Sequence, residues 1–277
     1  MTGQRKSVTQ RLLEGGVTTG LLLFALVPVY WMVSSSLKSD PELSQIEATW
    51  FPHEATLDQY RAALDQTPLL ESLLLTGILA VATAVIVVIF GSLAAYAVTQ
   101  WSFPGKDSFL GVTLFTQLLP QSAVVVPLYL LWNKVGLVGS VGGLTGVYVC
   151  LFIPVAVWML VGFFRSIPYE LTEAGLIDGA NRVRILWTII LPVVRPALAA
   201  VAVYTVIIAW GEFLFALVFL TGPRTTATVT LASLIGEHDP NVGPLMAAST
   251  LVCVPPLILF FAMQRQFVAG LTGGSVK

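Results

Sequence analysis

The stretch ELTEAGLIDGANRVRILWTIILP occupies residues 170–192 and lies between two long apolar stretches. It predicts a polar hairpin, with about two turns of helix, a break at Gly179 and a second helix that Pro192 ends. Three of the chain's 15 acidic residues stand in this stretch: Glu170, Glu173 and Asp178. Charge concentrated in this way indicates a surface that docks a partner, while an ordinary amphipathic helix at a membrane interface is the alternative.

The composition places the chain among membrane proteins. Of the 277 residues, 56% are hydrophobic and 10% are charged, and the mean hydropathy is +0.85, whereas a soluble domain is about a quarter charged. The net charge of −1 leaves no basic surplus for binding nucleic acid. The two cysteines, Cys150 and Cys253, stand in apolar stretches, so we expect two small buried residues and no disulfide or metal site.

The apolar pattern predicts an all-α polytopic membrane protein with six transmembrane helices. A bilayer core of about 30 Å needs about 20 apolar residues of helix. Six stretches qualify, at about 17–37, 70–98, 109–132, 142–164, 197–221 and 244–263. The first has no small-residue cleavage site, so we expect it to be both a span and the targeting signal. Residues 1–277 are thus predicted to form a single transmembrane domain with a polar loop over 165–196.

Basic residues set the expected orientation, because cytoplasmic loops of membrane proteins are enriched in Lys and Arg. With the N-terminus inside, the inner side carries Arg5, Lys6, Arg11, Lys106, Arg165, Arg182, Arg184, Arg195, Arg265 and Lys277. The outer side carries only Lys38, Arg61, Lys134 and Arg224. The opposite orientation would invert this bias, so both termini and the loop over 165–196 are expected in the cytoplasm.

The residue types that catalysis needs are not clustered in the sequence. The two histidines, His53 and His238, fall in predicted outer loops with no metal-type cluster near either. The sequence contains neither a G-x-S-x-G nucleophile elbow nor a G-x-x-x-x-G-K-[ST] phosphate loop. We therefore expect no enzyme activity and no cofactor, metal or nucleotide bound by this chain itself.

A few polar side chains fall inside the predicted spans, where such groups are functional candidates. Glu212 stands beside Trp210 and Phe213, a combination that suits a hydroxyl-rich ligand. These three residues are candidates to line a substrate path, while a place near the outer interface or a pairing with a partner subunit is the alternative for Glu212. Gln117 and Gln121 are weaker candidates, since four residues apart they would share one helix face and could instead bond a neighbouring helix.

The hairpin also carries a longer pattern. It resembles the EAA motif of ABC importer permeases. The pattern consists of Glu173-Ala174-Gly175, three residues, Gly179, nine residues, Ile189, one residue and Leu191-Pro192. Every fixed position matches except the second alanine, which is Gly175. Glycine keeps the position small but loosens the helix by up to about 1 kcal/mol. Asp178-Gly179-Ala180 also resembles the D-G-A common in sugar permeases.

The resemblance extends over nearly the whole chain. Three further segments resemble short motifs of the same family. They are Ser36-Leu37-Lys38, residues 56–60, and Ala95-Tyr96-Ala97 with residues 103–106. Residues 210–213 resemble its W-N-E-F motif, with Gly211 in place of asparagine. The tail GLTGGSVK at 270–277 resembles the G-L-T-x-G-A-V-K ending of maltose-type carbohydrate permeases, which separates them from peptide, phosphate and metal permeases.

The resemblance implies an ABC type I importer permease fold, in one of two different membrane subunits of a bacterial sugar or glycoside importer. It implies a homologous partner permease, two ATPase subunits that hold ATP and magnesium, an extracytoplasmic binding protein, and the lipids of the cytoplasmic membrane. The coupling helix would seat in an ATPase cleft. Its residues would be Glu170, Glu173, Ala174, Gly175, Asp178, Gly179 and Ala180. The alternatives are a stand-alone secondary carrier or channel for a small polar solute, or an ABC permease for a glycerol phosphate.

Overall fold

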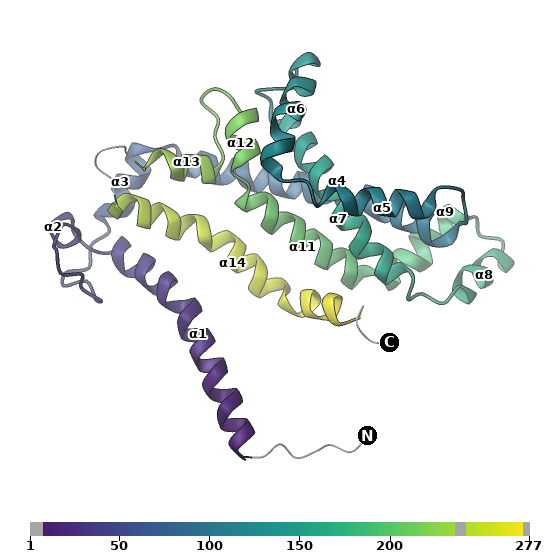
Figure 1. The fold of residues 1–277 in the computed structure, drawn as a ribbon, viewed down its shortest axis with the longest axis horizontal. Coiled ribbons are helices and arrows are strands. Elements are labelled where there is room, and N and C mark those ends of the chain that lie inside the picture. Colours follow the sequence, from purple (N-terminus) through teal and green to yellow (C-terminus); the bar gives the residue numbers. More distant parts are fainter. Residues whose placement is uncertain (1–7, 236–241, 274–277) are drawn as a thin grey trace. The chain divides into compact units, whose positions relative to one another are not determined.

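The computed structural model describes residues 8–235 and 242–273, with side chains over 13–235 and 242–264. Every regular element in this part of the chain is a helix, as the sequence predicted (Figure 1). Four helices are long and apolar enough to cross a membrane, namely α1 (Val8–Ser36), α4 (Leu69–Gln100), α7 (Val141–Phe164) and α14 (Val242–Gly273). Arg5, Lys6, His238 and the tail residues 274–277 lie outside the described residues.

Two further candidate spans are bent helix pairs. α5 (Lys106–Thr116) and α6 (Gln121–Lys134) meet at 106°, so the continuous helix expected over 109–132 is wrong. The break falls before Pro120, which lacks a backbone N–H and disfavours helix in the residue before it. Counting each bent pair as one span gives up to six spans.

The second bent pair contains the hairpin's second arm. This arm runs through α9 (Arg182–Ile185), a π-helical turn (Leu186–Ile190) and α10 (Leu191–Val193), and it meets α11 (Arg195–Gly211) at 78°. The fifth span, expected over 197–221, is also interrupted. The backbone at Glu212 is extended, with ψ of 130°, and α12 (Leu214–Phe219) is a separate short helix.

The chain divides into two compact units, Met1–Leu69 with Leu231–Cys253 and Leu70–Thr230 with Val254–Lys277. The single domain expected for 1–277 stays a prediction. The first unit contains α1, α2 (Asp40–Leu43) and α3 (Asp58–Gln66), and α13 (Ala227–Ser233) crosses from one unit to the other. The second unit holds the hairpin and the polar residues that follow α5 and α11.

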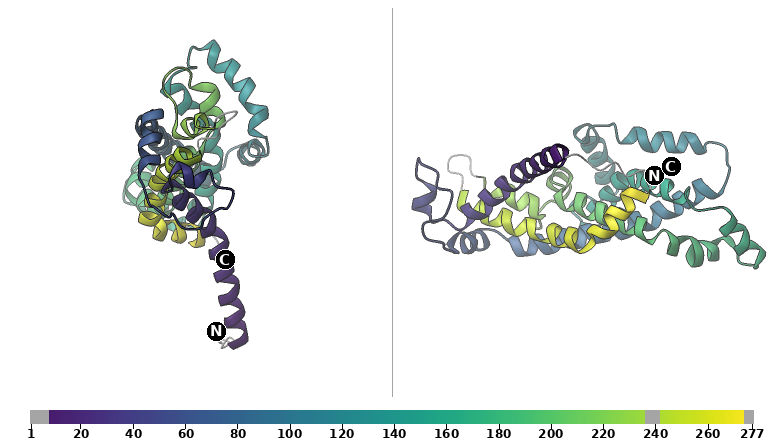
Figure 2. Two further views of the ribbon diagram at one scale, coloured as in Figure 1. Left: turned by 90° about the vertical axis from the view of Figure 1, so that its left-hand side faces the viewer. Right: turned by 90° about the horizontal axis from the view of Figure 1, so that it is seen from below.

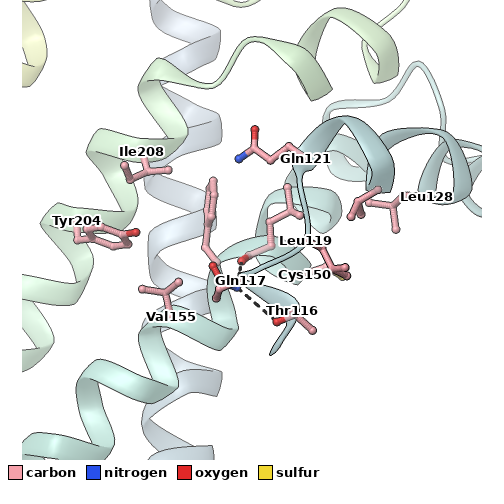
Figure 3. A pocket seen from close by; sticks show the side chains of 12 residues that line it. Thr116, Gln117, Leu119, Gln121, Leu128, Cys150, Val155, Tyr204 and Ile208 are labelled. Atoms are coloured by element: carbon pink, nitrogen blue, oxygen red, sulfur yellow. Dashed lines mark hydrogen bonds between the residues drawn. The ribbon is translucent and has the colours of Figure 1, made fainter. Parts of the chain in front are cut away.

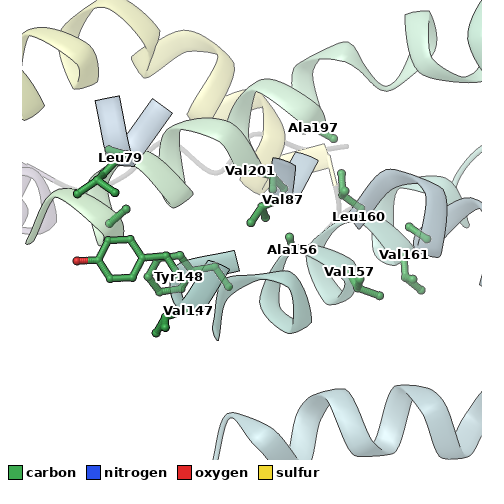
Figure 4. Close-up of a cluster of buried hydrophobic side chains, with 14 of the residues drawn as sticks. Leu79, Val87, Val147, Tyr148, Ala156, Val157, Leu160, Val161, Ala197 and Val201 are labelled. Carbon is green, nitrogen blue, oxygen red and sulfur yellow. The ribbon is translucent and has the colours of Figure 1, made fainter. Parts of the chain in front are cut away.

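The core of the second unit lies where α4 and α11 pack against α7. Val87, Ala156, Leu160 and Val201 are buried together there (Figure 4). At Gly91 the two backbones of α4 and α7 come close, because a Cβ atom there would lie 3.3 Å from the Cβ of Ala156. Small residues at such contacts let membrane helices approach closely.

Candidate functional site

The hairpin lies at one end of the second unit (Figures 1 and 2). Its first arm is α8 (Glu170–Ile177), which follows Pro168 and has Glu170 and Glu173 in its first turn. Acidic side chains are favoured there because the helix N-terminus carries partial positive charge. The sequence prediction of a helix here is confirmed.

One face of α8 forms a continuous exposed stripe. The stripe consists of Glu170, Glu173, Ala174, Ile177 and Asp178, which follow the i, i+3, i+4, i+7, i+8 spacing of a single helix face. Three of these side chains are acidic, and the apolar Ile177 is 85% exposed. Leu171 and Leu176 of the same helix are exposed as well, so α8 presents apolar side chains beside its acids.

The opposite face of α8 packs inward. The buried Thr172 hydroxyl donates to Oε1 of Gln100 at the end of α4, over 3.1 Å. Gly175 is also buried, and a Cβ atom there would lie 3.0 Å from side-chain carbons of both Ile185 and Ile189. The departure from the EAA pattern therefore faces the hairpin's own second arm and not the exposed stripe.

The turn between the two arms is closed by backbone hydrogen bonds. Gly179 has φ of 81°, and its N–H donates to the carbonyl of Leu176, while the N–H of Ala180 donates to the carbonyl of Gly175. This pair of bonds is the Schellman motif, which uses glycine because a left-handed residue with a Cβ atom is strained. Asn181 then caps α9, its Oδ1 accepting the Arg184 N–H over 2.8 Å.

The second arm is held against the end of α4. The Tyr96 hydroxyl donates to the Arg182 carbonyl over 3.1 Å, and the Arg182 guanidinium lies 5.6 Å from the centre of the Trp101 ring. The π-helical turn that follows widens the helix just before Pro192, whose ring would otherwise clash with the preceding turn. Both arms of the hairpin are thus attached to α4.

The predicted coupling residues therefore divide by position. Glu170, Glu173, Ala174 and Asp178 lie on the exposed stripe, Gly175 is buried, Gly179 makes the turn, and Ala180 is half-buried against the core. Sequence reasoning missed Ile177. The signal for it was present, since Ile177 stands four residues after Glu173 on the same helix face.

Glu212 lies at the break between α11 and α12, and it is 7% exposed. Its Oε1 accepts the Phe215 N–H at 2.8 Å, and its Oε2 accepts the Ala216 N–H at 2.9 Å and the Tyr148 hydroxyl at 2.8 Å. The carboxylate therefore caps the first turn of α12 and ties it to α7. Both carboxylate oxygens of Glu212 are therefore engaged in hydrogen bonds within the protein.

A hollow of about 290 Å³ lies between the α5–α6 break, α7 and α11 (Figure 3). Gln117, Gln121 and Tyr204 supply polar groups to it. Gln117 follows α5 and Gln121 begins α6, so the expectation that they share one helix face is wrong. They line the same hollow because the chain bends between them.

A second hollow of about 400 Å³ adjoins the first, since Gln121 and Ile208 line both. Phe213 and Glu212 line the second hollow. Trp210, the other path candidate, lines neither hollow and packs against the core. The expected burial of the cysteines is also wrong, because Cys150 and Cys253 are both exposed, Cys150 within the first hollow.

Comparison with known proteins gives the family. Residues 87–273 match the model for the inner membrane component of binding-protein-dependent transport systems. The chain belongs to this family. A trehalose transport system permease of Mycobacterium tuberculosis is 34% identical over 92% of this chain and 93% of its own length. A trehalose/maltose transport system permease of Thermococcus litoralis is 34% identical over 99% of both chains.

A solved structure of another protein has the same fold as this chain. It is a chain of a bacterial ABC transporter that imports alginate, matched with a TM-score of 0.79 over 96% of this chain and 100% of that one, at 22% identity. The expected ABC type I importer permease fold is confirmed. The chain is a permease subunit of an ABC importer, and neither the stand-alone carrier nor the glycerol phosphate permease is favoured.

Proposed function

We propose that this permease imports a sugar or glycoside together with a second, homologous permease subunit, two ATPase subunits and an extracytoplasmic binding protein. The relatives named for trehalose and for trehalose/maltose support a carbohydrate substrate, since each aligns with more than nine-tenths of this chain. The subunit sits in the bacterial cytoplasmic membrane with both termini in the cytoplasm, as the distribution of basic residues favours. ATP and magnesium belong to the ATPase partners.

The exposed stripe of α8 is the observation that carries the proposal. Its acids Glu170, Glu173 and Asp178 fit a cleft with a basic rim, and Ile177 fits an apolar floor. Glu173 stands at the middle of the stripe, so we assign it the central contact with the ATPase subunit.

The attachments of the hairpin support a role in transmitting motion. Thr172 bonds to Gln100, and Tyr96 bonds to the backbone of Arg182, so a displaced α8 takes the end of α4 with it. Closure of the ATPase subunits on ATP would then favour one arrangement of the spans. Release of ATP would favour the other arrangement. This is alternating access driven by different contacts in two states.

The test exchanges one charge on the stripe. Glu173→Lys should abolish ATP-driven uptake of trehalose or maltose into proteoliposomes that hold the whole importer, because the side chain would repel a basic rim. The amount of chain inserted in the membrane should not change. Asp107→Lys is the matched control, since this exposed acid at the start of α5 lies outside the stripe. Normal uptake by Glu173→Lys would overturn the coupling assignment.

A further inference from the structure

The first hollow offers hydrogen-bonding groups that the protein itself leaves largely unused. The Tyr204 hydroxyl, from α11, has no hydrogen-bond partner among the described residues. The Gln117 Nε2 approaches the Thr116 hydroxyl and the Leu151 carbonyl only at 3.5 Å, the outer limit of a hydrogen bond. Figure 3 shows Gln117 and the Tyr204 hydroxyl directed into the hollow from different elements. Such groups at membrane depth require water or a ligand.

The chemistry of the lining selects a class of ligand. Amide and hydroxyl groups both donate and accept hydrogen bonds, which matches the hydroxyls of a carbohydrate. Phe152 and Ile208 supply apolar surface for the C–H faces of a sugar ring. None of the residues that line this hollow carries a charge, so an anionic sugar phosphate would find no cation to pair with.

We propose that this hollow is a subsite for one ring of a neutral carbohydrate on its way through the importer, with Gln117 and Tyr204 as its polar contacts. The inference rests on the proposed function and names a substrate contact within this chain. A volume of about 290 Å³ stands at the small end of ligand pockets, which suits a single ring.

The adjoining hollow extends the path along α11. Gln121 lines both hollows, so its amide can hydrogen-bond a ligand in either one. Phe213 lines the second hollow with 39% of its surface exposed. Glu212 also lines the second hollow, but its carboxylate is occupied by α12 and Tyr148. Trp210 lines neither hollow and packs on the core.

The chain carries a native probe for this subsite. Cys150 lines the first hollow, whereas Cys253, which is also exposed, does not. In the assembled importer, a membrane-impermeant methanethiosulfonate reagent should modify Cys150 in a Cys253→Ser background. Trehalose, supplied with the binding protein, should slow that reaction at least threefold. Cys253 in a Cys150→Ser background should show no such protection. Absence of reaction at Cys150, or a reaction that trehalose leaves unchanged during active uptake, would overturn the proposal.

A second measurement separates substrate contact from folding. Tyr204→Phe and Gln117→Ala should each lower the sugar transported per ATP hydrolysed by roughly threefold to tenfold, the size expected from one hydrogen bond. Copurified ATPase subunit and the thermal unfolding midpoint should stay unchanged. Unaltered transport stoichiometry in both variants would refute the subsite. If the unmodified importer shows no ATP-driven sugar uptake at all, the proposed function fails instead.

Discussion

Gly175 is the one position at which the chain departs from the EAA pattern, and its surroundings show why a small residue is needed. Carbons of Ile185 and Ile189 would stand 3.0 Å from an added Cβ atom, which is tighter than ordinary van der Waals contact. The sequence located this departure, but it could not show which side of α8 the residue faces. That depends on how the two arms of the hairpin pack.

Gly179 has a different reason to be glycine, and this leads to a prediction. Gly179→Ala places a Cβ atom on a residue with φ of 81°, so it should destabilise the chain by about 1–2 kcal/mol. The measurement is the thermal unfolding midpoint of the purified importer in detergent. Gly162→Ala is the control, because α7 leaves open space around Gly162 at an ordinary helical φ. Equal midpoints for the two variants would contradict the strained turn.

Side-chain placement at the break after α11 allows a second prediction. Tyr148→Phe removes the hydroxyl that donates to Glu212 Oε2 and should cost about 1.5–3 kcal/mol, the range for hydrogen bonds to charged groups. Tyr204→Phe removes the same atom from a tyrosine without a described protein partner, so its unfolding midpoint should match the unmodified chain. A stable Tyr148→Phe variant would show that this bond does not hold α12 to α7.

At the scale of elements, the loop between α1 and α3 carries a pH-sensitive contact. The Thr49 hydroxyl donates to Glu42 Oε1 over 2.6 Å, and the backbone N–H of His53 lies 3.2 Å from Oε2. These hydrogen bonds, that from Thr49 foremost, lower the pKa of Glu42 below its ordinary value of 4.5. Because the pKa of Glu42 is lower in the folded chain than in the unfolded chain, ionised Glu42 stabilises the fold at pH values above about 4.5. This stabilisation is lost as the pH falls from about 4.5 through the lowered pKa.

Limited proteolysis of this loop at a series of pH values tests the contact. Cleavage should accelerate as the pH falls from about 5 to below the lowered pKa, because protonated Glu42 loses its charge-assisted hydrogen bonds. Glu42→Gln should remove this acceleration. Glu47→Gln, at an exposed acid of the same loop, should retain it. An identical pH profile for the unmodified chain and Glu42→Gln would reject the assignment.

Hydropathy predicted where the apolar helices occur, but it did not predict where they break. Gln117–Pro120 and Glu212 lie inside apolar windows, so length and composition alone favoured continuous spans there. The competing effects are local: Pro120 removes a backbone donor, and the Glu212 carboxylate satisfies the first N–H groups of α12. The exposed stripe of α8 was largely predictable because it follows helical spacing. Tyr204 was not, since its neighbours come from distant parts of the chain.

At the scale of the whole molecule, the balance of basic residues predicts the topology. A reporter that is active only in the cytoplasm should be active when fused after Lys277 and inactive when inserted at Arg224, since the positive-inside rule places these positions on opposite sides. A fusion inserted within 178–181 should report the cytoplasm. Activity at Arg224 together with silence at 178–181 would reverse the orientation and remove α8 from the reach of an ATPase.

The two attachments of the hairpin to α4 have a mechanical consequence. Tyr96 and Gln100 stand four residues apart on one face of α4, and each bonds to a different arm. A single bond would let the hairpin rotate about that bond, whereas two bonds about 6 Å apart resist this rotation. Under the proposed coupling role, a push on α8 would therefore become a bending moment on α4. Ala95, Tyr96 and Val98 are buried in the core within the roughly 14 Å of helix between Gly91 and Gln100, so this moment would be passed directly to the core packing of the second unit.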